Sequence, residues 1–172
     1  LGLSRPHMPY KALIMAILIS PMIVPLIITA AGMFFFYSQL GLTHTFTGLI
    51  LAHTALGTPF VVITVTATLT GFDTNLIRAS QSLGADTLRT FFKVIMPLIL
   101  PGVISGALFA FITSFDEVVV VLFIGSIEQV TIPKQMWAGL RQETSPVILS
   151  MATCLVLLSI ALLTTVELLR RR

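Results

Sequence analysis

The feature that most constrains this chain is a long stretch without charge: residues 12–72 contain no Asp, Glu, Lys or Arg. Two shorter charge-free stretches follow, one between Lys93 and Asp116 and one between Glu143 and Glu167. A helix that crosses a bilayer needs about 20 mostly apolar residues, so the long stretch has room for two spans and each shorter one for a single span. Only 10% of the residues are charged, whereas soluble domains carry about 25%. The sequence therefore predicts an integral membrane protein and excludes a soluble or a disordered chain.

Four membrane-spanning helices account for these stretches. We expect an all-α, polytopic membrane helix bundle with spans at Ala12–Phe36, Phe46–Leu69, Gly102–Ile124 and Val147–Leu169. As one continuous helix, the first span would be about 37 Å long. Pro21 and Pro25 lie inside it, and prolines within a membrane are tolerated where neighbouring groups satisfy the freed carbonyls. We therefore expect the first span to be bent and buried in the bundle.

Basic residues are unevenly divided between the two sides that these spans define. One side holds Arg5, Lys11, Arg78, Arg89, Lys93, Arg170, Arg171 and Arg172. The other side holds only Lys134 and Arg141, and includes the loops Tyr37–Thr45 and Gly125–Pro146. Because positive residues accumulate in cytoplasmic loops, we expect the first set and both chain ends to be cytoplasmic. The basic residues are too scattered to follow a phosphate backbone, so we expect no nucleic-acid partner.

The first five residues suggest that the sequence is part of a longer chain. Residue 1 is Leu, and the segment before Arg5 is too short for the basic head and apolar core of a signal peptide. We interpret it as the end of an earlier helix, and the chain as the C-terminal part of a larger polypeptide.

In the third span, Gly102, Gly106 and Ala110 recur every four residues, a spacing that lets another helix approach closely.

The cytoplasmic segment 71–93 predicts a helix, a glycine turn and a second helix. Asp73 or Thr74 can cap the first helix, and Gly84 suits the left-handed residue that ends it. Asp86 or Thr87 can cap the second helix. Each helix has one apolar face, formed by Leu76, Ile77, Ser80 and Leu83 and then by Leu88, Phe91, Phe92 and Ile95. Two interpretations stay open: a helix that rests on lipid headgroups, or an element that docks a cytoplasmic partner.

A motif in this segment reads Arg78-Ala79-Ser80, three residues, Gly84, nine residues, then Val94-Ile95-Met96-Pro97. It resembles the "EAA" loop of ABC importer permeases, which reads Glu-Ala-Ala, three residues, Gly, nine residues, Ile-x-Leu-Pro. The Ala, the Gly, the Pro and the Gly-to-Pro spacing match, while Arg and Ser replace the Glu and the second Ala. The resemblance implies that residues 73–96 are a cytoplasmic coupling loop. It also implies that this loop docks on a separate ATP-binding subunit dimer through Ala79, Ser80, Gly84 and Ala85.

No feature of the chain predicts catalysis. It has no segment of the form Gly-x-x-x-x-Gly-Lys-Ser/Thr that could hold ATP phosphates, so ATP hydrolysis would belong to a partner. No Ser-His-Asp or Cys-His pattern occurs either. The histidines, His7, His44 and His53, are too scattered to predict a metal site, and we expect His53 to form a hydrogen bond within the bundle. We therefore expect no enzyme activity, no cofactor and no metal.

Two carboxylates, Asp116 and Glu117, lie about two-thirds of the way along the third span. A carboxylate at mid-membrane costs roughly 2.5 to 3.5 kcal/mol on insertion scales, so the pair requires an explanation. In one interpretation, one acid caps a helix break and the other pairs with Lys134 or Arg141. In the other, the pair forms a cation site on a water-filled pathway. Adjacent helical residues point about 100° apart, so we expect only one, Asp116 by preference, to line it.

The stretch around these acids reads Ser114-Phe115-Asp116-Glu117-Val118-Val119-Val120. It is similar to the Ser-x-Asp-Asp-Val-Val stretch of spermidine/putrescine-type permeases. The outer segment Ile132-Pro133-Lys134-Gln135-Met136-Trp137, followed by Ser145-Pro146, resembles their loop between the last two helices, and the likeness extends from about Ala12 to the C-terminus. It implies a polyamine site at Asp116, Glu117, Phe115 and Trp137, since carboxylates and aromatic faces recognise ammonium groups. Trp137 also fits an aromatic belt at the membrane interface.

Together, the two resemblances imply the C-terminal part of a type I ABC importer permease fold in a bacterial inner membrane. Residues 1–172 would form a single transmembrane permease domain without its N-terminal helices. Its partners would be the lipid bilayer, a second permease subunit, the ATP-binding subunit dimer and an extracytoplasmic substrate-binding protein. Two alternatives stay open: an importer permease for another small solute, or an ATP-independent secondary transporter with proline-broken helices. The second alternative leaves the spacing from Gly84 to Pro97 unexplained.

Overall fold

The computed structural model describes residues 2–5, 8–142 and 146–170. Leu1, His7, Glu143, Ser145, Arg171 and Arg172, which contribute to the sequence interpretation, lie outside these ranges. Most of the described residues are helical and none of them lies in a strand, as predicted for an all-α membrane protein. In chain order the elements are α1 (Lys11–Ile23), α2 (Leu26–Gln39), α3 (Phe46–Thr70), α4 (Asn75–Ser82), α5 (Thr87–Thr90), the π-helix η1 (Phe91–Ile95), α6 (Met96–Phe115), α7 (Val119–Ile124), α8 (Ile132–Gln142) and α9 (Pro146–Arg170).

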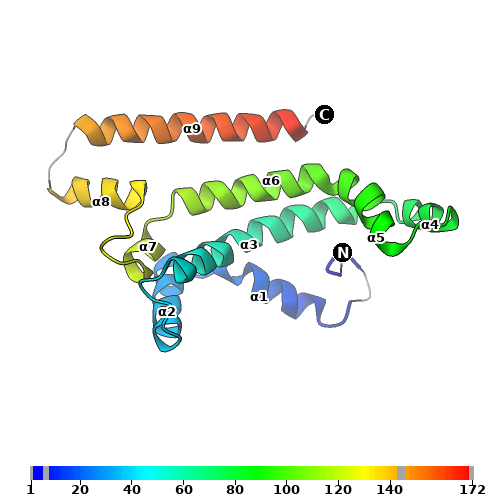
Figure 1. Ribbon diagram of the computed structural model, residues 1–172, viewed down its shortest axis with the longest axis horizontal. Coiled ribbons are helices and arrows are strands. Elements are labelled where there is room, and N and C mark those ends of the chain that lie inside the picture. Colours follow the sequence, from blue (N-terminus) through cyan, green and yellow to red (C-terminus); the bar gives the residue numbers. More distant parts are fainter. Residues whose placement is uncertain (1, 6–7, 143–145, 171–172) are drawn as a thin grey trace.

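Helices α3 and α6 form the centre of the fold and lie side by side along most of their length (Figure 1). Small residues permit this approach. Gly102 and Gly106 of α6 are buried, and a Cβ atom added to Gly106 would lie only 2.9 Å from the Cα atom of Val61 in α3. A Cβ atom on Gly57 of α3 would lie 3.0 Å from the Cβ atom of Ala110. The prediction that this spacing admits a neighbouring helix is therefore confirmed, and the neighbour is α3.

The closeness of α3 and α6 predicts a site-specific loss of stability. We expect Gly106→Ala to lower the melting temperature of the purified protein in detergent, because overpacking of a tight contact costs about 1–3 kcal/mol. Gly32→Ala in α2 is the matched control, since a Cβ atom there meets nothing within 4 Å. Thermal unfolding followed by tryptophan fluorescence measures both variants. Equal melting temperatures for the two would contradict the packing that we describe.

The first expected span, Ala12–Phe36, is not one continuous helix. It divides into α1 and α2, whose axes differ by 108°, so the expected bend is confirmed and its sharpness exceeds the prediction. Pro25 causes the break, because it pushes Val24 into an extended conformation (ψ 135°) and cannot donate a hydrogen bond. The expected burial of this span is wrong for α1, which has no buried residue within the described chain. One side of α1 packs against α3 and is half-buried, and the exposed apolar side chains are left to contact lipid or another subunit.

The second and fourth expected spans are confirmed. Helix α3 covers Phe46–Thr70 and α9 covers Pro146–Arg170, and each boundary lies within one residue of the prediction. Three helical stretches are long and apolar enough to cross a membrane, and a fourth crossing results if α1 and α2 count as one broken span. The apolar stretch of α9 has no residue buried inside the chain; one side of the helix contacts α6 and α8, and the other apolar side chains are exposed.

The third expected span, Gly102–Ile124, has the wrong boundaries. Helical structure runs from Thr87 through α5, η1 and α6 to Phe115, and α7 is a separate short helix. Pro97 lies inside this run and does not interrupt it. The π-helix η1 directly precedes it and shifts the hydrogen-bond pattern, so that the Met96 N–H group donates to the carbonyl of Phe91, five residues earlier. The helix therefore begins earlier than the sequence indicated, and it ends before the two acids.

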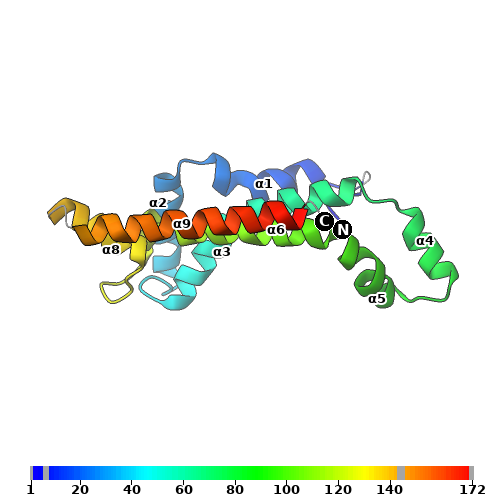
Figure 2. The same cartoon turned by 90° about the horizontal axis from the view of Figure 1, so that it is seen from above.

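The elements gather at two ends of the helix stack. The start of α1, the end of α9 and the α4–α5 segment lie at one end, and α2, α7 and α8 lie at the other (Figures 1 and 2). At the α7 end, a buried apolar cluster ties α2, α3 and α7 together through Ala30, Tyr37, Leu49, Ala52, Leu56, Val120, Val121 and Ile124. This cluster positions the break between α6 and α7 beside α3.

Candidate functional site

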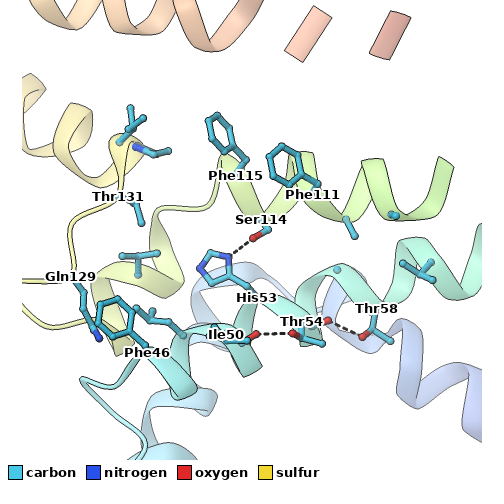
Figure 3. Close-up of a pocket in the computed structure, with 18 of the residues that line it drawn as sticks. Phe46, Ile50, His53, Thr54, Thr58, Phe111, Ser114, Phe115, Gln129 and Thr131 are labelled. Atoms are coloured by element: carbon cyan, nitrogen blue, oxygen red, sulfur yellow. Dashed lines mark hydrogen bonds between the residues drawn. The ribbon is translucent and has the colours of Figure 1, made fainter. Parts of the chain in front are cut away.

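A pocket of about 1010 Å³ lies between α3 and α6, near the end at which α7 and α8 gather (Figure 3). Most of its wall is apolar and comes from α3, from α6 and from the segment that joins α7 to α8. Aromatic side chains line it at Phe46, Phe111 and Phe115, and the rings of Phe111 and Phe115 stack with their centres 5.6 Å apart. Such a pocket suits a ligand with an alkyl chain, because apolar side chains provide contact area and a few polar groups fix the orientation.

Hydroxyl and imidazole groups form the polar part of the pocket wall. His53 of α3 and Ser114 of α6 are hydrogen-bonded, with Nδ1 and Oγ 2.8 Å apart. The expectation that His53 forms a hydrogen bond within the bundle is therefore confirmed, and the bond links the two central helices. Thr54 and Thr58 also line the pocket, and each hydroxyl donates to the backbone carbonyl four residues earlier. The sequence interpretation did not identify these threonines as pocket residues.

Asp116 and Glu117 lie in the break between α6 and α7, which corrects their expected position inside a continuous span. The Glu117 side chain is 7% exposed, and its Oε1 atom accepts a hydrogen bond of 2.8 Å from the N–H group of Val120 in the first turn of α7. Glu117 also interacts electrostatically with His53. One acid therefore caps a helix break, as one of the two interpretations predicted, and this acid is Glu117.

Asp116 has a different environment from its neighbour. Its side chain is exposed, and no hydrogen bond from the described part of the chain holds its carboxylate. It sits at the C-terminal end of α6, where the helix dipole disfavours a negative charge by about 0.3–1 kcal/mol. Lys134 does not compensate, because its ammonium donates to the backbone carbonyls of Ser126 at 2.8 Å and Gln129 at 3.1 Å. The ion pair with Lys134 that we considered is therefore wrong, and helix stability does not account for Asp116.

The two aromatic candidates are separated by the structure. Phe115 lines the pocket directly beside Asp116, on the last turn of α6. Trp137 lies on α8, is 45% exposed and is not among the residues that line this pocket. Neither Asp116 nor Glu117 belongs to the lining either. Of the four predicted substrate residues, only Phe115 therefore contributes to the pocket wall.

The helix–glycine–helix segment lies at the far end of the α3–α6 pair (Figure 1). Gly84 adopts the predicted left-handed conformation, with φ +83°. Asp86 caps α5, since its carboxylate accepts a hydrogen bond of 2.7 Å from the N–H group of Arg89. Ala79 and Gly84 are exposed, and Leu83 between them is 88% exposed. The helix, glycine turn and second helix predicted for this segment are therefore confirmed, and the turn presents an open surface. The predicted cap of the first helix is not confirmed, since Thr74 occupies the N-cap position of α4 without a capping hydrogen bond from its side chain.

Ser80 holds the two halves of this segment together. Its hydroxyl lies 2.9 Å from the hydroxyl of Thr90, which is only 2% exposed. The Ala85 N–H group donates to the Ser80 carbonyl at 3.1 Å, which closes the turn around Gly84. Ser80 and Ala85 thus face partly inward, whereas Ala79 and Gly84 are exposed.

Residues 2–172 match the family model described as "Binding-protein-dependent transport system inner membrane component". The chain belongs to this family. It is therefore a multi-pass membrane permease, in agreement with its all-helical fold and its long apolar helices. The resemblance to importer permeases that rested on the Gly84-to-Pro97 spacing is confirmed.

Several permeases of this family are similar over much of the chain. The spermidine/putrescine transport system permease protein PotC of Haemophilus influenzae is 30% identical over all of this chain and 67% of its own length. PotC of Escherichia coli is 30% identical over 99% of the chain and 64% of its own length. The osmoprotective compounds uptake permease protein GgtD of Synechocystis is 34% identical over 66% of the chain and 38% of its own length. The chain thus spans about two-thirds of the length of the PotC proteins that it matches.

Proposed function

We propose that this chain is the membrane-spanning permease subunit of an ATP-driven importer for polyamines such as putrescine and spermidine. The observation that carries the proposal is the similarity to PotC along the entire chain. The pocket between α3 and α6 supports it, because stacked phenyl rings suit a methylene chain with positive ends. The importer would lie in a bacterial inner membrane, with the α4–α5 segment and both chain ends in the cytoplasm.

Within this importer, Asp116 and Phe115 would contact the substrate. Asp116 is exposed at the end of α6 and carries a charge that no group within the described residues balances by a hydrogen bond. Phe115 offers its ring to the same ligand from the pocket wall. Glu117 would support the site through the α6–α7 break, which it caps, and Trp137 would contribute from α8, outside the pocket.

The α4–Gly84–α5 segment would dock on a dimer of separate ATP-binding subunits. Its exposed Ala79 and Gly84 would form the contact surface, and Ser80 and Ala85 would hold the turn in shape. A second permease subunit would complete the translocation path, and an extracytoplasmic substrate-binding protein would deliver the polyamine. The outward-facing apolar side chains of α1 and α9 leave ample surface for lipid and for the second subunit.

The test is uptake of labelled putrescine by the assembled transporter in proteoliposomes, with and without internal ATP. We expect uptake only with ATP and the binding protein present. A secondary transporter would instead take up its substrate from an ion gradient alone, and such a result would contradict the proposal. The similarity to GgtD favours a second candidate, an importer permease for osmoprotective compounds. Such a permease would take up those compounds and would not transport putrescine.

A further inference from the structure

One end of the pocket is formed by the segment that joins α7 to α8. Glu128 of this segment lines the pocket, and no other acidic residue does so in the described part of the chain. Its side chain is exposed, whereas that of the adjacent Gln129 is buried. Phe115, at the end of α6, belongs to the same lining. The apolar wall thus has one carboxylate at its border.

Hydrogen bonds hold the backbone of this segment in place, and none of them involves the Glu128 side chain. Ser126 and Gln129 bond reciprocally, each backbone N–H group donating to the other's side-chain oxygen, at 2.9 Å and 3.2 Å. Lys134 donates from its ammonium to the backbone carbonyls of the same two residues. Within the described chain, no hydrogen bond engages the Glu128 carboxylate. The neighbouring residues hold the backbone at Glu128, and its carboxylate can bind a cationic ligand.

We propose that Glu128 binds one ammonium group of a linear diamine whose methylene chain lies in the pocket. This inference rests on the proposed function, which makes amines the substrate, and it assigns a carboxylate that is separate from Asp116. A diamine has two positive ends, so one carboxylate at Asp116 leaves the second end without a partner. Charge-assisted hydrogen bonds to carboxylates are about twice as strong as neutral ones, and an apolar surrounding strengthens them further.

An exposed acidic side chain on a loop does not by itself indicate a binding site. Two observations set Glu128 apart: it lines a large pocket with aromatic walls, and its segment is held by a lysine that does not pair with it. Lys134 acts as a positioning residue here, because it neutralises carbonyl dipoles rather than the carboxylate. The carboxylate therefore remains available to a cationic ligand.

The test compares Glu128→Gln and Glu128→Asp with the wild type in the assembled transporter. The readouts are the putrescine concentration for half-maximal uptake and the competition by the amino alcohol of the same chain length, which lacks the second ammonium. For Glu128→Gln we expect the half-maximal concentration to rise about tenfold and the preference for the diamine over the amino alcohol to disappear. Glu128→Asp should retain most of that preference, since it keeps the charge.

Different results would contradict the role of Glu128 and the proposed function. If the wild type takes up putrescine and Glu128→Gln keeps both its half-maximal concentration and its preference, the role of Glu128 is contradicted and the proposed function stands. If the wild type transports no amine, the proposed function is contradicted, and the amine ligand of Glu128 with it. A rise in half-maximal concentration that is equal for the diamine and the amino alcohol would indicate a structural role and overturn the inference.

Discussion

Asp116→Asn is expected to reduce putrescine uptake by about tenfold to a hundredfold in the assembled transporter. A hydrogen bond to a charged group contributes about 1.5–3 kcal/mol, and each 1.4 kcal/mol corresponds to a factor of ten. The substitution keeps the size of the side chain and removes its charge. Because Asp116 is exposed at the end of α6 and holds no other element in place, the protein should fold and assemble normally. Initial rates of uptake of labelled putrescine measure the effect.

Asp116→Glu is the matched control, since it retains the carboxylate at the same helix end. We expect it to keep a substantial part of the uptake, and the amount of ATP-binding subunit that co-purifies should be the same for both variants. Uptake by Asp116→Asn at the wild-type rate would remove Asp116 from the substrate site. A loss of assembly in Asp116→Asn would show that the residue has a structural role instead.

Gly84→Trp is expected to detach the ATP-binding subunits or to uncouple their ATP hydrolysis from transport. Gly84 lies at the exposed turn between α4 and α5, where a large side chain would stand in the proposed contact surface. Forcing extra volume into a packed contact costs about 1–3 kcal/mol, so the fraction of bound ATPase should fall roughly fivefold to a hundredfold. Co-purification of the ATP-binding subunit with the tagged permease measures this fraction.

Gly41→Trp separates contact surface from backbone strain. Gly41 also has a left-handed φ, +67°, and a Cβ atom at either glycine meets nothing within 4 Å. The two substitutions therefore introduce the same side chain with similar backbone strain at opposite ends of the helix stack. We expect Gly41→Trp to retain the ATPase. Equal retention by Gly84→Trp, with normal uptake, would contradict the docking role of the α4–α5 turn.

The sequence predicted most of the fold because its signals are local or continuous. Charge-free stretches located α3 and α9, since a span must exclude charge over its whole length. The positive φ of Gly84 and the cap at Asp86 follow from the short-range preferences of glycine and aspartate. The spacing of Gly102 and Gly106 predicted a close helix partner, although it could not identify α3 as that partner.

The errors arise where the effect of a residue depends on its surroundings. Pro25 breaks a helix, whereas Pro97 lies within a continuous helical run, and composition alone does not distinguish these positions. Because we placed the third span at Gly102–Ile124, we expected Asp116 and Glu117 inside a continuous helix, although the helix ends at Phe115. Glu128 was missed because its proximity to the pocket depends on the fold of the α7–α8 segment. The Ser126-x-x-Gln129 pattern was the available signal, since it is typical of a closed turn.

Competition for uptake tests which class of substrate the transporter carries. Uptake of labelled putrescine by the assembled transporter in proteoliposomes is measured in the presence of unlabelled polyamines, amino acids, osmoprotective compounds or oxyanions, each at the same excess. We expect putrescine and spermidine to suppress the uptake and the other classes to leave it unchanged. Absence of ATP-dependent putrescine uptake, or suppression by an osmoprotectant as strong as that by spermidine, would contradict the assignment.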